Sequence, residues 1–159
     1  MAASISSPKT ALITGASSGI GRALAGCFAA DGWNLVLAAR GAAAMEALAA
    51  ELTARHGIGA TVIGADLAAA DGARALHAEV ERRGIAVDAL VANAGSGTYG
   101  DVRDGDLARD VAMIQLNTVS VVVLTRLFLP GLIARRGKIL VTASTAAFQP
   151  CPHMAIYGA

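Results

Sequence analysis

One short segment organises the whole sequence: Thr14-Gly15-Ala16-Ser17-Ser18-Gly19-Ile20-Gly21. It follows the apolar run 11–13 and leads into an alanine-rich helical pattern that starts at Arg22. A buried strand, a glycine turn and a helix start, in that order, can hold a phosphate group. The glycines let the backbone approach an anion closely, and the unpaired first N–H groups of the helix lie at its positive dipole end. Ser17 and Ser18 can add hydroxyl donors, although such a segment can also be a simple turn.

Strand and helix patterns alternate along the chain, with short connections between them. We expect strands at 10–14, 34–39, 61–65, 86–92 and 137–144, and helices at 19–31, 42–56, 69–83 and, after a glycine-bearing loop at 95–105, up to 130–136. The strands are apolar, which is typical of a parallel sheet covered by helices on both faces. Right-handed crossovers then give a single α/β domain over residues 1–159. This domain is a doubly wound parallel sheet in three α/β/α layers, with ligands bound at the carboxyl ends of the strands.

Composition and charge argue against several classes of function. The 159 residues carry a formal net charge of +1 without a basic cluster, so we expect no binding to nucleic acid or to a membrane surface. The most apolar region, 111–134, is interrupted by Gln115, Asn117, Arg126 and Pro130. It therefore falls short of the ~20 clean apolar residues that a membrane span needs. We interpret this region as a helix buried against the sheet or against a partner subunit.

The amino terminus and the cysteines indicate a cytoplasmic protein. Residues 1–8 contain neither a basic start nor an apolar stretch, so we expect no secretory signal. Cys27 and Cys151 show no metal-ligand spacing, and Cys27 is expected to pack within the first helix. A reduced, cytoplasmic setting without a bound metal is the expectation.

The residues that follow the second strand bear on the choice of cofactor. An acidic residue about 20 positions beyond the glycine turn would bind the ribose 2′-hydroxyl of NAD. Here Ala39 occupies that place and Arg40 follows it. A neutral side chain beside a guanidinium favours the 2′-phosphate of NADP, so NADP is expected and NAD is the less favoured cofactor. The alternative is that Arg40 is an ordinary solvated residue at the start of the next helix.

Two further strand ends carry candidate ligand-binding residues. Asp66-Leu67 follows the third strand, and Asp66 can accept a hydrogen bond from an adenine amino group or cap the following helix. Asn93-Ala94-Gly95 follows the fourth strand. The small residues there leave room for a ribose or a flat ring, and Asn93 can tie neighbouring strands together. By itself this second motif would be a turn.

A serine, a phenol and an asparagine indicate the chemistry. Ser144 ends the fifth strand, and Tyr157 follows thirteen residues later. Their hydroxyls could bind one carbonyl oxygen, with the phenol donating its proton as hydride reaches the carbon. Asn117, a poor helix former within the long helix, could bend it and hold a proton-relay water. Each residue also has a structural explanation: Ser144 as a cap, Tyr157 as a partly buried aromatic, and Asn117 as simply tolerated.

Together these residues resemble the short-chain dehydrogenase/reductase family, from about Lys9 to the last residue. The matching motifs, in the family's order and spacing, are 14–21, Asp66, Asn93-Ala94-Gly95, Asn117, Ser144 and Tyr157. The resemblance implies a Rossmann-type oxidoreductase whose nicotinamide cofactor is bound by Gly15, Ser17, Ser18, Gly19, Ile20, Gly21, Arg40, Asp66, Leu67, Asn93, Ala94 and Gly95. It also implies that Tyr157 is the acid/base, that Ser144 orients the carbonyl or alcohol, and that Asn117 supports the relay water. A second Asn is frequent in the family where Ala92 stands here.

The carboxyl-terminal end departs from the family pattern. Relatives carry a lysine four positions after the tyrosine, which holds the nicotinamide ribose, and this sequence ends at Ala159, two positions short. The later strands and the substrate-covering loop of the family also fall beyond it. Without them we expect the fifth strand to be an open apolar edge and the long helix to be poorly covered. The expectation is therefore that these residues belong to a longer chain, with a truncated paralogue as the alternative.

The resemblance implies an NADP(H)-dependent enzyme that transfers hydride to or from a small carbonyl or alcohol substrate. A homodimer or homotetramer is expected, with the long helix at 106–132 in the subunit interface. One alternative is a truncated, catalytically inactive nucleotide-binding module of the same lineage. Another is a Rossmann-like methyltransferase, but an acid at the end of the second strand would favour that, and Ala39 stands there.

Overall fold

Five parallel strands form one sheet in the computed structural model, which describes residues 8–159. The strands are β1 (Thr10–Thr14), β2 (Asn34–Ala39), β3 (Ala60–Gly64), β4 (Ala89–Ala92) and β5 (Lys138–Val141). They lie in the order β3-β2-β1-β4-β5, and every neighbouring pair is parallel. The chain builds outward from β1 to β3 and then crosses to β4 on the other side of β1. This reversal confirms the predicted doubly wound sheet. The prediction about a secretory signal rests on residues 1–8, of which 1–7 lie outside the described residues.

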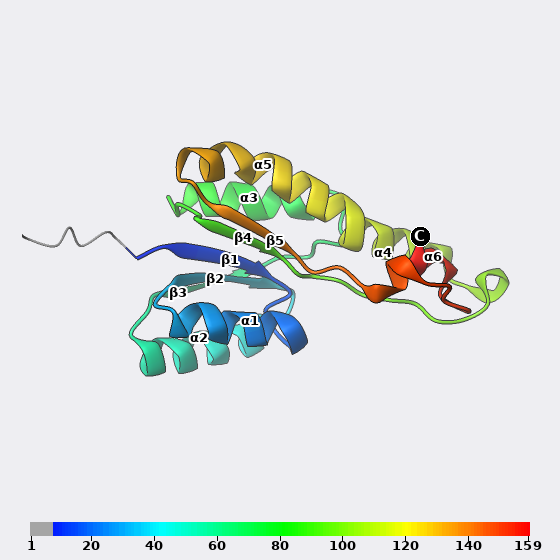
Figure 1. Cartoon of the computed structure of the whole chain (residues 1–159), viewed down its shortest axis with the longest axis horizontal. Coiled ribbons are helices and arrows are strands. Elements are labelled where there is room, and N and C mark those ends of the chain that lie inside the picture. The colour runs from blue at the N-terminus through cyan, green and yellow to red at the C-terminus, as the bar shows by residue number, and fades with distance from the viewer. Residues whose placement is uncertain (1–7) are drawn as a thin grey trace, which may run out of the picture.

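Helices cover both faces of the sheet (Figure 1). The helices are α1 (Gly19–Ala30), α2 (Ala42–His56), α3 (Gly72–Arg82), α4 (Leu107–Ile114), α5 (Ser120–Ala134) and the short α6 (Ala155–Gly158). In Figure 1, α1 and α2 lie below the sheet, and α3 and α5 lie above it. The segments that carry α4 and α6 extend past the carboxyl ends of the strands. The three layers predicted from the strand and helix alternation are therefore present.

Two hydrophobic cores lie on the two faces of the sheet, because alternate strand residues point to opposite faces. Ile13 of β1 belongs to the core under α1 and α2, while its neighbour Leu12 belongs to the core under α3 and α5. The first core adds Leu35, Leu37, Met45, Leu48 and Leu52, and the second adds Val36, Leu76, Leu90, Leu124, Phe128 and Leu132. The central strands are buried on both sides, so β1 is held rigidly where it runs into the glycine turn.

The predicted long helix is interrupted near its middle. A π-helical turn at Gln115–Val119 separates α4 from α5, and Pro130 lies inside α5 rather than at its end. By length and composition, the continuous helical run Leu107–Ala134 could cross a membrane. The expectation that its polar residues leave it too short for a membrane span is therefore wrong. In the fold, α5 buries Leu124, Phe128 and Leu132 against the sheet and α3, which is one of the two alternatives that the sequence analysis left open. The absence of membrane binding stays a prediction.

Two local expectations need correction, and a third agrees with the structure. The third helix begins at Gly72 rather than residue 69, because a turn comes first in which the amides of Ala69 and Gly72 are donors. The predicted burial of Cys27 is wrong, since this residue is exposed on α1. The four residues of β5 are all exposed, which agrees with the open apolar edge that the sequence predicts.

Candidate functional site

The amino terminus of α1 is the centre of the candidate site. Ser18 is its N-cap residue and makes no side-chain capping bond within residues 8–159, so the N–H groups of the first helical turn remain available to an external acceptor. Gly19 has a positive φ of 53°, and no atom of the described chain lies within 4 Å of the place where its Cβ would be. Ser18, Gly19 and Ile20 are all exposed at the mouth of the helix. An anion can therefore reach these amides directly.

Gly15 and Gly21 allow the close packing beneath this helix terminus. A Cβ on Gly21 would collide with the carbonyl oxygen of Gly15 and would lie 2.6 Å from Nδ2 of Asn93. Gly15 has a φ of 67°, and its own Cβ would lie 2.9 Å from Cα of Ala94. The glycine pattern thus brings the loop after β1 against the loop after β4. This explains why both segments must carry small residues.

A hydrogen-bond network joins the ends of β1, β4 and β5. The Thr14 hydroxyl donates to the carbonyl of Val91 (3.3 Å) and accepts from the amides of Asn93 (2.9 Å) and Ala94 (3.0 Å). Asn93 Nδ2 donates to the Thr14 carbonyl (3.0 Å), and its Oδ1 accepts from the Thr142 hydroxyl (3.0 Å). Asn93 therefore ties neighbouring strands together, as the sequence suggested.

Sequence reasoning included Thr14 in the glycine-turn motif but gave neither threonine of this network a role. Thr14 is fully buried at the end of an otherwise aliphatic strand, and that contrast is the signal that could have found it. Thr142 follows β5 directly and also donates its amide to the carbonyl of Ala92 (3.0 Å). Nothing in its sequence neighbourhood distinguishes it from an ordinary loop threonine.

The ends of β2 and β3 present one exposed cation and one exposed acid. Arg40 follows Ala39 at the end of β2, is exposed, and forms no ion pair with any residue between 8 and 159. Asp66 is also exposed, and its Oδ1 accepts from the amide of Ala68 (3.1 Å). It therefore caps the turn before α3 and not the helix itself, whose N-cap residue is Asp71. Leu67 is only 5% exposed and belongs to the core under α3. Only the backbone of Leu67 can therefore contact a ligand.

Asn117 lies in the π-helical turn and holds the loop after β4. Its Nδ2 donates to the carbonyl of Ser96 (2.7 Å), and its Oδ1 accepts from the amide of Ser96 (3.0 Å). A Cβ on Gly95 would lie 3.4 Å from Asn117 Oδ1, so the loop approaches this side chain closely. The sequence suggested that Asn117 bends the helix, and the structure has a π-helical turn at this position. The predicted role in holding a water stays a prediction.

Ser144 and Tyr157 lie on segments that pack against each other. Ser144 caps the short 3-10 helix Thr145–Phe148, with its Oγ accepting from the amide of Ala146 (3.2 Å). Tyr157 lies in α6, which neighbours this turn in Figure 1. The Tyr157 ring lies beside the loop after β4, because a Cβ on Gly97 would be 3.4 Å from its Cδ2. The segments that carry Ser144 and Tyr157, and the loop that Asn117 holds, thus lie next to one another beyond the carboxyl ends of the strands.

Of two cavities in the structure, one lies beside the segment that carries Tyr157 and the other lies between α3 and α5. A cavity of about 280 Å³ adjoins the Tyr157 segment and is lined by residues that include Tyr99, Asp101, Arg109, His153 and Ile156. Another, of about 330 Å³, lies between α3 and α5. Neither cavity is lined by a predicted site residue. We therefore place the site at the strand ends, where the polar groups converge, and not at the larger cavity.

Comparisons with known protein families, sequences and solved structures agree with the resemblance found in the sequence motifs. A family model described as short chain dehydrogenase matches residues 9–159. The uncharacterized oxidoreductase YmfI of Bacillus subtilis (strain 168) is 40% identical over 140 residues, which is 86% of this chain and 56% of that protein. Among solved structures, the alcohol dehydrogenase of the archaeon Thermococcus sibiricus, complexed with 5-hydroxy-NADP, has 33% identity and a TM-score of 0.88, covering 94% of this chain and 64% of its own.

The L-sorbose reductase of Gluconobacter frateurii, complexed with NADPH and L-sorbose, has 34% identity and a TM-score of 0.88. That match covers 95% of this chain and 58% of the reductase. This chain spans between 56% and 64% of the length of these three proteins. Because the family model covers nearly all of the described residues, the chain belongs to the short-chain dehydrogenase/reductase family.

Proposed function

We propose that this chain binds NADP(H) and is the cofactor-binding part of an oxidoreductase acting on a carbonyl/alcohol pair. One observation carries the proposal: the Ser18 side chain makes no capping bond to α1 within residues 8–159, and backbone atoms already occupy the places where Gly15 and Gly21 would carry a Cβ. A pyrophosphate fits this arrangement because it needs both the free amides and the close backbone approach.

Arg40 supports NADP over NAD. It is exposed at the end of β2, and the neighbouring Ala39 offers no carboxylate to compete for a ribose hydroxyl. A guanidinium without an ion-pair partner can bind a 2′-phosphate through two parallel hydrogen bonds. The two solved relatives described above contain NADP-type cofactors, which is consistent with this assignment.

The residues at the carboxyl edge of the sheet would serve the substrate. When bound, a nicotinamide cofactor supplies or accepts the hydride. Ser144 Oγ accepts from Ala146, so its own hydrogen is free to bind a substrate oxygen. The phenol of Tyr157 would give a proton to that oxygen or take one from it. Asn117 acts as a positioning residue, because its amide fixes the loop beside the Tyr157 ring.

Calorimetric titration with NADPH and NADH tests the cofactor assignment. The parent chain should bind NADPH about tenfold or more tightly than NADH, as one charge-assisted contact implies. Arg40→Ala should erase that preference by weakening NADPH alone, while Arg55→Ala, an exposed arginine on α2, should leave it intact. Equal affinities in the parent would remove the NADP assignment, and binding of neither nucleotide would overturn the proposal.

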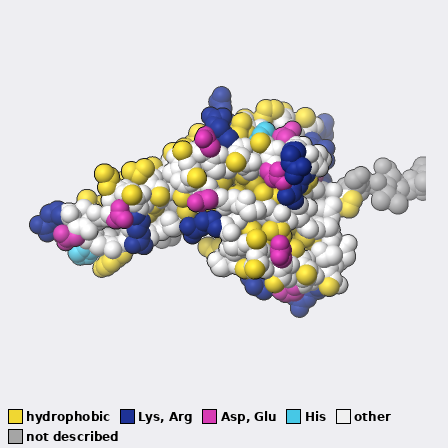
Figure 2. Space-filling view, turned by 180° about the vertical axis from the view of Figure 1, so that it is seen from behind, with side chains coloured by type: hydrophobic (Ala, Val, Ile, Leu, Met, Phe, Trp, Pro, Cys, Tyr) yellow, Lys and Arg dark blue, Asp and Glu magenta, His cyan; other side chains and the backbone are white. Residues whose placement is uncertain are grey.

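We further propose that α4 and α5 pair with a second copy of this chain. Figure 2 shows hydrophobic side chains along the upper border of the molecule, where these helices run. The exposed apolar residues of the two helices include Leu107 (77% exposed), Val111 (56%), Ile114 (46%), Val122 (57%) and Ile133 (68%). An apolar surface of this kind is typical of subunit interfaces. A monomer by light scattering would contradict this interface.

A further inference from the structure

The outer edge of β3 carries backbone groups that the sheet does not use. In a parallel sheet, alternate residues turn their N–H and C=O groups to opposite sides. The amide of Ala65 donates to the carbonyl of Ala39 on β2 (3.0 Å), so the odd-numbered residues of this segment face β2. The residues that face outward are Ala60, Val62 and Gly64. Such a row of free groups is a template for pairing with another strand.

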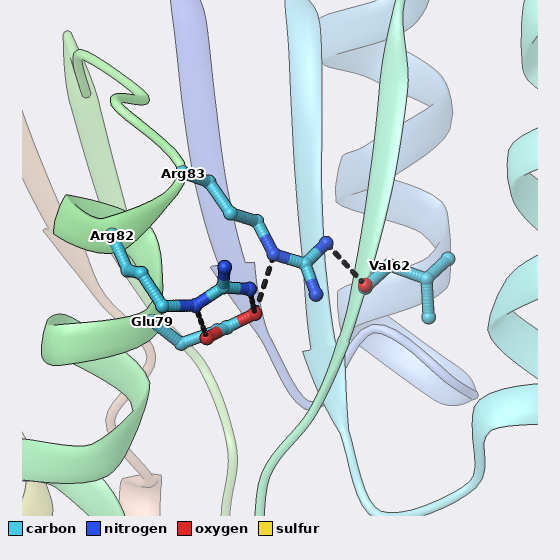
Figure 3. Close-up of polar contacts among 4 residues, drawn as sticks. All are labelled: Val62, Glu79, Arg82 and Arg83. Carbon is cyan, nitrogen blue, oxygen red and sulfur yellow. Dashed lines mark hydrogen bonds and ion pairs between the residues drawn. The ribbon is translucent and has the colours of Figure 1, made fainter.

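Arg83, at the carboxyl-terminal end of α3, occupies this edge (Figure 3). Its Nη1 donates to the outward carbonyl of Val62 (3.3 Å), and its Nε donates to Oε1 of Glu79 (2.6 Å). One planar guanidinium therefore joins a carboxylate of α3 to the free edge of β3. Figure 3 shows the side chain reaching across from α3 to β3, and 36% of it is exposed.

Glu79 is itself held by a second arginine. Arg82 Nε donates to Oε2 of Glu79 (2.7 Å), and Arg82 Nη2 donates to Oε1 (2.7 Å). The two hydrogen bonds from Arg82, and then the one from Arg83, lower the pKa of Glu79 to about 2. The carboxylate is therefore charged at neutral pH and keeps Arg83 in place. Within the described chain, Arg82 makes no hydrogen bond to β3, which makes it a natural control.

β3 has no protection of its own against strand pairing. Its sequence, Ala-Thr-Val-Ile-Gly, contains neither a charged residue nor a proline, the two devices that edge strands usually carry. We propose that Glu79 and Arg83 form an edge clamp that closes β3 against pairing with β3 of a second copy of this chain. A second strand would have to displace the guanidinium from Val62 and would bring up a second Arg83 of like charge.

Amide hydrogen exchange on the whole chain tests the edge clamp. In Arg83→Met, which keeps the aliphatic stem, the amides of Ala60, Val62 and Gly64 should exchange roughly tenfold more slowly as protein concentration rises, because a second strand covers them. In the parent and in the matched control Arg82→Met, their exchange should not depend on concentration. No concentration dependence in Arg83→Met, or the same dependence in both variants, would overturn the proposal.

A second substitution keeps the test independent of the stability of Arg83→Met. Glu79→Gln keeps the Arg83 side chain but removes the carboxylate that holds it. The same amides should therefore show a smaller slowing of exchange with protein concentration. Adding Gly64→Pro removes one outward N–H, and the site has open space around the Cβ position. This addition should abolish the slowing in both variants. Slowing that persists with Pro at position 64 would place the association elsewhere and would overturn the clamp.

Discussion

The side chain of Asn117 and the backbone of Ser96 form two reciprocal hydrogen bonds across 21 residues of sequence. They join the π-helical turn to the loop after β4, and that loop contains Gly97, beside which the Tyr157 ring lies. The position of Tyr157, the proposed acid, therefore depends on the loop after β4, which the side-chain amide of Asn117 holds in place. Asn117 thus contributes to the site by fixing this loop, independently of its proposed role in holding a water.

Asn117→Ala should lower the free energy of unfolding by about 1–3 kcal/mol, because the amide and the carbonyl of Ser96 lose their partners. Urea unfolding followed by circular dichroism measures this change. Thr118→Ala is the control, since Thr118 is exposed on the same helical turn and should change stability little. Equal stability of the two variants would mean that water replaces the asparagine at no cost.

The contact between Asn117 and Ser96 also shows where sequence reasoning ends. Periodicity predicts α2 over Ala42–His56 with the observed bounds, because its apolar face and the stop at Gly57 are both local signals. The apolar pattern predicts a strand over 137–144, but β5 covers only Lys138–Val141, since β4 itself ends at Ala92 and offers no longer partner. Strand length depends on the neighbour, which a local pattern does not contain.

The candidate site was predictable only as a set of strand ends. Parallel strands place their carboxyl ends at one edge, so residues such as Asn93 and Ser144 can be grouped from the sequence alone. The partners of Asn93 are Thr14, at the end of β1, and Thr142, directly after β5, 79 and 49 residues away. Their identity required the actual register of β1, β4 and β5.

Gly21→Ala should impair both folding and nucleotide binding. A methyl group there collides with the Gly15 carbonyl, and because the obstacle is backbone the glycine turn must move. Gly26→Ala is the matched control: it lies in the same helix, its Cβ would meet no described atom within 4 Å, and it should stabilise the chain by about 0.5–1 kcal/mol. Thermal unfolding and NADPH titration of both variants give the comparison. If Gly21→Ala bound NADPH as tightly as the parent, the glycine turn would not be the phosphate site.

The stabilising effect of Glu79 should depend on pH. Its pKa is about 2 in the folded chain against 4.5 for a glutamate side chain free in water, so folding favours the charged form. The contribution is fully present above about pH 4.5, and it is lost as the pH falls through 2. The difference in unfolding free energy between the parent and Glu79→Gln should therefore be largest near neutral pH and should shrink toward about pH 2.

Salt provides the control for this pH prediction. Glu79 and its two arginines lie at the surface, so high ionic strength should reduce the same difference at neutral pH. A difference that stays constant from about pH 6 to about pH 2 would show that the two side chains differ only in packing.

The side chains of Asp88 and Arg135, at the amino-terminal end of the strands, should interact strongly and stabilise the fold together. Asp88 is 6% exposed, and its carboxylate accepts from Arg135 Nε (2.9 Å) and from the amide of Thr10 (2.9 Å). Arg135→Ala leaves this buried carboxylate with the Thr10 amide alone and should cost about 1–3 kcal/mol, less than for a fully buried pair because Arg135 is half exposed.

A double-mutant cycle tests this coupling. Asp88→Asn removes the charge but keeps an oxygen for the Thr10 amide, so Arg135→Ala should cost much less in that background than in the parent. Urea unfolding of the four proteins gives the coupling energy, with Arg136→Ala as a control for loss of a neighbouring surface charge. Strict additivity would mean that solvent reaches Asp88 freely and that the pair contributes no stability.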